Sequence, residues 1–151
     1  RWAMSSGNPG RLKMAVADSP GITSNSTALR DTSTMPPKDI RLGMPRFQPA
    51  HFPKNLQLID GLSALAREQG CTMGQLALAW VLAQGPHIVP IPGTTRIDHL
   101  EENVAATRVS LSREMRDRLN ALINQTTVSG PRYAPAVQAE IDTEEMEVPS
   151  K

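Results

Sequence analysis

Residues 88–103 read IVPIPGTTRIDHLEEN, and this stretch decides which kind of fold the chain can adopt. Residues 87–92 are mostly apolar and β-branched, which predicts a short strand buried on both faces. Its prolines lack the backbone N–H that a central strand donates, so the pattern is an unusual one. Residues 96–106 follow at once with helical spacing. We predict a helix there, capped by Thr95 and with Asp98 in its first turn.

The start of this helix carries groups that suit an anion. The first N–H groups of a helix have no intrahelical acceptor and carry partial positive charge. A glycine lets backbone approach a ligand, two hydroxyls can donate, and a guanidinium fits a phosphate. These groups belong to Gly93, Thr94, Thr95 and Arg96.

One turn later, spacing puts His99 on the face of Thr95 and Arg96, with Glu102 and Asn103 a further turn on. Two readings stay open on spacing alone. One is a phosphate site, and the other is a strand-to-helix turn with a good cap and a surface arginine. The motif is neither GxGxxG nor a P-loop.

Three further segments predict amphipathic helices. Residues 55–70 show helical apolar spacing that stops at Gly70. Residues 72–85 open with the capping-box pair Thr72 and Gln75, and residues 113–124 open with Ser112 as cap. The residues predicted to face inward are Leu58, Leu62, Leu65, Ala66, Met73, Leu76, Ala77, Trp80, Val81, Met115, Leu119, Leu122 and Ile123. A single strand among helices cannot satisfy its own backbone groups, so the rest of a sheet must come from elsewhere.

The composition of the chain argues against several classes of protein. The chain has 151 residues, enough for one domain with a core, and 16 basic against 15 acidic residues. That balance argues against a general nucleic-acid binder. No apolar run approaches the length of about 18 residues that a membrane span needs. Cys71 is the only cysteine, which excludes an internal disulfide and a cysteine-based zinc site. We expect a cytoplasmic protein with no metal site.

The two ends of the chain look different from its middle. Residues 1–27 show no sustained period and are rich in Ser, Asn, Gly and Pro, which predicts disordered coil. Residues 28–53 continue as a loop punctuated by prolines. Residues 140–147 carry five acids and predict a solvated tail. The first residue is Arg rather than Met, which we take as a sign of a processed or incomplete chain.

Three blocks resemble the aldo-keto reductases, the NADPH-dependent barrel enzymes. IPGTTRIDHLEENVAA (residues 91–106) closely resembles the cofactor-binding segment of that family. Residues 44–85, beginning MPRFQPAHFPKNLQ, are similar to its seventh-helix region, and SGPRYAPAVQAEID (residues 129–142) resembles its C-terminal segment. The resemblance covers about residues 28–148. It implies an α/β fold that is the C-terminal part of a (β/α)8 TIM barrel, incomplete and mostly helical with one or two strands. Residues 28–151 would form this part, and residues 1–27 are unmatched.

In that family the last barrel strand and the helix after it bind the adenosine 2′-phosphate end of NADP. The cofactor-binding residues that the resemblance implies are Pro92, Gly93, Thr94, Thr95, Arg96, His99, Glu102 and Asn103. Residues 93–96 would line the 2′-phosphate, and Glu102 with Asn103 would contact adenine. His99 stands where some branches carry an arginine. The charge of Arg96 would favour NADP over NAD.

The resemblance also says what is missing. The family reduces an aldehyde or ketone with a tyrosine as proton donor, helped by an Asp, a Lys and a His from the N-terminal half of the barrel. The only tyrosine here, Tyr133, lies in the C-terminal block instead. We therefore expect a fragment with the adenosine end of the site, no catalytic residue and no turnover by itself. The alternative is a non-enzymatic NADP-binding or interaction module that needs a partner chain to complete the barrel.

Overall fold

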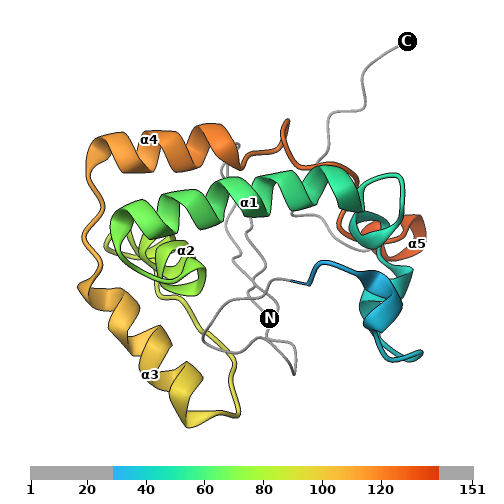
Figure 1. The fold of residues 1–151 in the computed structure, drawn as a ribbon, viewed down its shortest axis with the longest axis horizontal. Helices are drawn as coiled ribbons and strands as arrows, with labels where there is room; N and C mark the ends of the chain where they lie inside the picture. Colours follow the sequence, from blue (N-terminus) through green and yellow to red (C-terminus); the bar gives the residue numbers. More distant parts are fainter. Residues whose placement is uncertain (1–28, 140–151) are drawn as a thin grey trace.

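The computed structural model describes residues 29–139, and within this range the chain is helical with no strand (Figure 1). The α-helices are α1 (Phe52–Gln69), α2 (Met73–Leu82), α3 (Ile97–Ala105), α4 (Arg113–Leu122) and the short α5 (Pro135–Gln138). The 3-10 turns are η1 (Thr32–Thr34), η2 (Ile40–Gly43), η3 (Pro45–Phe47) and η4 (Ala106–Arg108). The predictions for residues 1–27 and for the acidic tail lie outside the described residues.

Helices α1, α2 and α4 enclose the core, and α3 attaches to it through α2. Figure 1 shows α1 lying between α4 and α2, with α3 reaching away from this stack. Leu76 of α2 is fully buried, with 0% of its surface exposed. The inward-facing residues were predicted correctly: ten are buried, and Leu58, Met73 and Leu122 are partly buried against the cluster.

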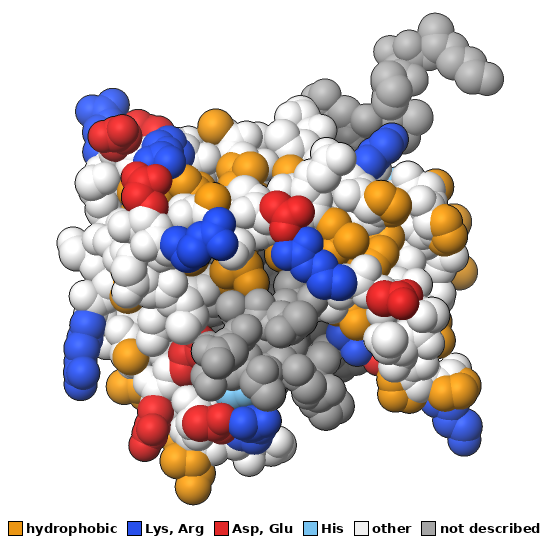
Figure 2. Space-filling view, in the orientation of Figure 1, with side chains coloured by type: hydrophobic (Ala, Val, Ile, Leu, Met, Phe, Trp, Pro, Cys, Tyr) orange, Lys and Arg blue, Asp and Glu red, His pale blue; other side chains and the backbone are white. Residues whose placement is uncertain are grey.

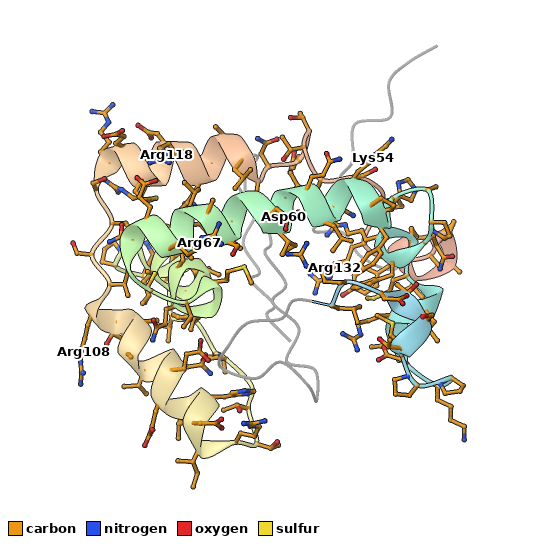
Figure 3. All side chains as sticks on the ribbon, in the orientation of Figure 1. Lys54, Asp60, Arg67, Arg108, Arg118 and Arg132 are labelled. Atoms are coloured by element: carbon orange, nitrogen blue, oxygen red, sulfur yellow. The ribbon has the colours of Figure 1, made fainter. Side chains whose placement is uncertain are left out.

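Polar contacts connect the same helices. The Trp80 indole N–H of α2 donates to Asn120 Oδ1 of α4 at 2.8 Å. Arg118 of α4 donates to Glu68 of α1, with Nη2 2.7 Å from Oε2 (Figure 3). Both partners of this ion pair are about half exposed, so it adds little to stability. The apolar cluster, rather than the ion pair, holds the helices together.

The chain ahead of α1 is tied to the chain after α4. Asn55 exchanges two hydrogen bonds with the backbone of Ser129, at 3.0 and 2.8 Å, and Arg46 Nε donates to the Gly130 carbonyl at 3.0 Å. Gly130 has a φ of 81°, and a Cβ there would lie 2.8 Å from the His51 ring. Only glycine fits both conditions. The loop predicted for residues 28–53 is therefore an ordered run of 3-10 turns where it is described, and α1 begins at Phe52 rather than Asn55.

Local capping signals were read correctly at most helix ends. Thr72 and Gln75 form both bonds of the capping box, and Ser112 Oγ accepts the Met115 N–H at 3.0 Å. Gly70 ends α1 in the left-handed region with a φ of 72°. The cap predicted for the third helix was wrong, because Arg96 rather than Thr95 occupies the N-cap of α3.

No strand forms over residues 87–92 in the described part of the chain, although the sequence predicts one there. A strand needs a neighbour to accept and donate its backbone hydrogen bonds, and none lies within residues 29–139. The side chains of this segment nevertheless alternate. Ile88 is 8% exposed and joins the core, whereas Val89 and Ile91 are 78% and 79% exposed. One side of the segment is covered by the helices and the other side is not.

None of the helices within the described range has the length and apolar character needed to cross a membrane.

Candidate functional site

The turn at residues 93–96 is held from both ends. Ile88 is buried in the core on one side, and His99 and Ala106 are buried where α3 meets α2 on the other. The residues between these anchors are half-buried or exposed. A Cβ built on Gly93 would meet no atom within 4 Å, so the protein itself does not require a glycine there.

Thr94 shapes the turn into α3. Its Oγ1 accepts the Arg96 N–H at 3.1 Å, just ahead of the first helical residue. Arg96 at the N-cap has extended dihedrals (φ −113°, ψ 137°) and makes no side-chain cap hydrogen bond. The start of α3 is thus closed on one side by a threonine hydroxyl, and Thr95 is left exposed beside it.

Arg96 is paired with a neighbouring carboxylate. Its Nε donates to Asp98 Oδ1 at 2.9 Å, and its Nη2 donates to Oδ2. The guanidinium holds the pKa of Asp98 at about 2, below its ordinary 3.8. Both side chains are close to half exposed, at 47% and 45%. Such a pair is weak in water, so Arg96 can exchange Asp98 for another anion. The sequence prediction missed this pair, although the spacing Arg-x-Asp signals it.

His99 does not share the surface of Thr95 and Arg96. It is 8% exposed, whereas the two earlier residues are on the surface. Helical spacing applies only to residues with helical dihedrals, and Thr95 and Arg96 precede the first turn. The structure therefore does not bring His99 onto the exposed face of the turn.

Glu102 and Asn103 are half-buried on the far part of α3. The carboxylate of Glu102 accepts a hydrogen bond from the hydroxyl of Thr72, at the start of α2. Its backbone carbonyl faces Gln75 Nε2 at 3.4 Å. This hydrogen bond between the two helices joins residues 30 positions apart, so spacing along the sequence does not predict it.

Other candidate groups do not add to this site. Tyr133 lies under the guanidinium of Arg132, whose Cζ is 5.1 Å from the ring centroid. Burial raises the pKa of the Cys71 thiol, which disfavours the reactive thiolate form. Among the described residues, no group of three or more His, Cys, Asp or Glu could hold a metal ion.

A shallow hollow of about 430 Å³ lies between the end of α2 and α4, lined by none of the predicted site residues. Its lining mixes Arg113 and Arg116 with Asp117, so it has no single charge preference. Figure 2 likewise shows acidic and basic side chains interspersed over the visible face. The hollow is therefore separate from the turn at residues 93–96.

Comparison with known proteins supplies the family. The sequence profile of the Aldo/keto reductase family matches residues 15–124. Aldo-keto reductase yakc of Schizosaccharomyces pombe, whose name specifies NADP(+), is 40% identical over 114 residues, or 76% of this chain and 34% of that protein. Aldo-keto reductase str7 of Strobilurus tenacellus is 37% identical over 110 residues, or 73% of this chain and 33% of that protein.

The chain thus spans about a third of the length of these curated relatives. The matched profile covers well over half of the chain itself, and the resemblance noted in residues 91–106 falls inside it. The chain belongs to the aldo-keto reductase family.

Proposed function

We propose that this chain is the C-terminal part of an NADP-dependent aldo-keto reductase barrel and binds the adenosine end of the cofactor. Residues 93–96 line the 2′-phosphate, Glu102 with Asn103 contact adenine, and Pro92 and His99 flank the turn. The observation that carries this proposal is the exposed turn at residues 93–96. It offers the open start of α3, an accessible glycine and an exchangeable guanidinium at one point. The relative named for NADP(+) supports the same cofactor.

The physical case for phosphate binding rests on complementary charge. The N-terminus of α3 favours negative charge through its N–H groups and its dipole. Arg96 can exchange Asp98, a singly charged partner, for the more highly charged 2′-phosphate and bind it through two N–H groups. NAD lacks this phosphate, so the same turn distinguishes the two cofactors.

The barrel half of the proposal is supported by residues 88–91. In a barrel strand, alternate residues face the helix layer and the barrel interior. Ile88 packs into the helices, and Val89 and Ile91 point away from them. We read this segment as the last barrel strand, seen without its neighbouring strands. In the completed barrel, NADPH would reduce an aldehyde or ketone.

A second candidate is a non-enzymatic module that binds NADP only when a partner chain supplies the other strands. The exposed apolar residues favour a module that is completed by a partner chain over a module that works alone. Beside Val89 and Ile91, α3 exposes Ile97, Leu100 and Val104 at spacings of three and four. Mixing the chain with the N-terminal two-thirds of the fission yeast relative would separate the candidates. NADPH oxidation that appears only in the mixture would favour a module completed in trans.

The test of cofactor binding is a thermal melt of the 151-residue chain followed by circular dichroism. A ligand that binds only the folded form adds RT ln(1 + [L]/Kd), about 2.7 kcal/mol at a hundred times Kd. We expect millimolar NADP to raise the Tm more than NAD does. Arg96→Ala should remove that difference. The matched control is Arg108→Ala, at the other end of the α3–η4 stretch (Figure 3), which should keep it. A melt that NADP does not shift would overturn the proposal.

A further inference from the structure

The start of α2 holds the side chain of an α3 residue in place. Thr72 Oγ1 accepts the Gln75 N–H at 3.1 Å and donates its own proton to Glu102 Oε1. A hydroxyl has one proton and two lone pairs, so it can do both at once. Thr72 is therefore both the cap of α2 and a donor to α3.

Gln75 adds a second connection. Its Oε1 accepts the Thr72 N–H at 3.2 Å, and its Nε2 donates to the Glu102 carbonyl at 3.4 Å. The capping box of α2 thus contacts both the side chain and the backbone of Glu102. Glu102 lies over the first turn of α2, where a Cβ on Gly74 would be 3.6 Å from its Oε1. The positive end of that helix favours the carboxylate as well.

This arrangement fixes a flexible side chain. A glutamate that is free in water samples many rotamers and loses that freedom when it binds a ligand. Here Oε1 is engaged by Thr72, and a carboxylate accepts through both oxygens. Oε2 therefore has a defined direction from which it can accept a further hydrogen bond.

We propose that Thr72 is a positioning residue for the adenine end of the cofactor site, acting through Glu102. This rests on the proposed function, in which Glu102 contacts adenine. The oriented carboxylate accepts from the exocyclic amino group of adenine and repels the carbonyl oxygen that hypoxanthine carries at the same place. Thr72 thereby sets the preference for an adenine cofactor over its hypoxanthine analogue.

A simple structural role for Thr72 predicts something different, and aspartate separates the two. Asp caps a helix as well as Thr does, so Thr72→Asp keeps the cap of α2. Ionised Asp has no proton to donate and repels the carboxylate of Glu102. Thr72→Ser keeps both the cap and the donor. The control is Ser112→Asp, the same change of a hydroxyl cap to aspartate on α4, where no bond to α3 is involved.

The experiment measures binding of NADP and of nicotinamide hypoxanthine dinucleotide phosphate to the chain by calorimetry. We expect the unmodified chain, Thr72→Ser and Ser112→Asp to prefer NADP by about tenfold, the size of one hydrogen bond to a charged group. Thr72→Asp should bind both ligands alike while it keeps a cooperative thermal melt, as Ser112→Asp does.

Each of the other outcomes contradicts a different part of the proposal. If Thr72→Asp retains the tenfold preference, Thr72 is only a cap, and the proposed function stands. If the unmodified chain binds both dinucleotides equally, the oriented carboxylate does not contact adenine, although the phosphate site remains. If the unmodified chain binds neither, the proposed function fails, and the role of Thr72 fails with it.

Discussion

Helices α2 and α3 are neighbours of similar length, but their N-termini are built in opposite ways. The start of α2 is closed by a complete capping box, and residues 76–81 behind it are all buried. The start of α3 has no side-chain cap from its N-cap residue, and His99 is its one buried residue. The chain thus completes the hydrogen bonding at the start of α2 with a capping box, whereas the start of α3 is where we propose that the cofactor phosphate binds.

Core truncation should produce the largest difference between the two helices. Leu76→Ala removes a side chain with no exposed surface and should lower the free energy of unfolding by about 2–5 kcal/mol. Leu100→Ala on α3 removes one that is 52% exposed and should change it by less than about 0.5 kcal/mol. Urea unfolding of both variants measures the difference. Equal losses would mean that α3 is packed against a covering surface in solution, as in a dimer.

Removing threonine hydroxyls tests the two helix starts at a smaller scale. Thr72→Ala should cost about 1 kcal/mol, because the Gln75 N–H loses its acceptor. Thr95→Ala should leave the unfolding free energy unchanged, because Arg96 and not Thr95 is the N-cap of α3. Thermal melts without ligand are sufficient for both. A loss at Thr95 as large as that at Thr72 would show that Thr95 does cap the helix in solution.

The features that the sequence predicted are those that depend on residues close together in the chain. The capping box, the cap at Ser112 and the inward faces of α1, α2 and α4 depend on residues three or four positions apart, and all were predicted correctly. The strand at residues 87–92 depends on partners outside the described range, so its apolar pattern alone could not establish it.

The site was harder to predict than the core. Thr94, Thr95 and Arg96 are three polar residues in a row, and which of them starts α3 depends on how the chain leaves the anchored Ile88. The helical face assigned to His99 failed for the same reason, since its register began one residue too early. The contact of Thr72 with Glu102 exists only because α2 packs on α3, and spacing along the chain carries no trace of it.

The smallest predicted effect concerns the ion pair at the start of α3. Arg96 holds the pKa of Asp98 at about 2, so the ionised carboxylate stabilises the fold above its ordinary pKa of 3.8. That contribution is lost as pH falls from about 4 toward 2, when the carboxylate is protonated. Asp98→Asn should therefore show a shallower decline in stability over this range, as measured by urea unfolding at each pH.

Asp39 provides the comparison, because Arg41 also holds its pKa at about 2. The side chains of that pair are only 15% exposed, against 47% and 45% for Arg96 and Asp98. Water screens the more exposed pair more strongly. Asp39→Asn, which keeps the cap of η2, should thus flatten the acid decline more than Asp98→Asn does. The reverse order would mean that Asp98 binds Arg96 tightly, and a tightly held Arg96 would not be available to a phosphate.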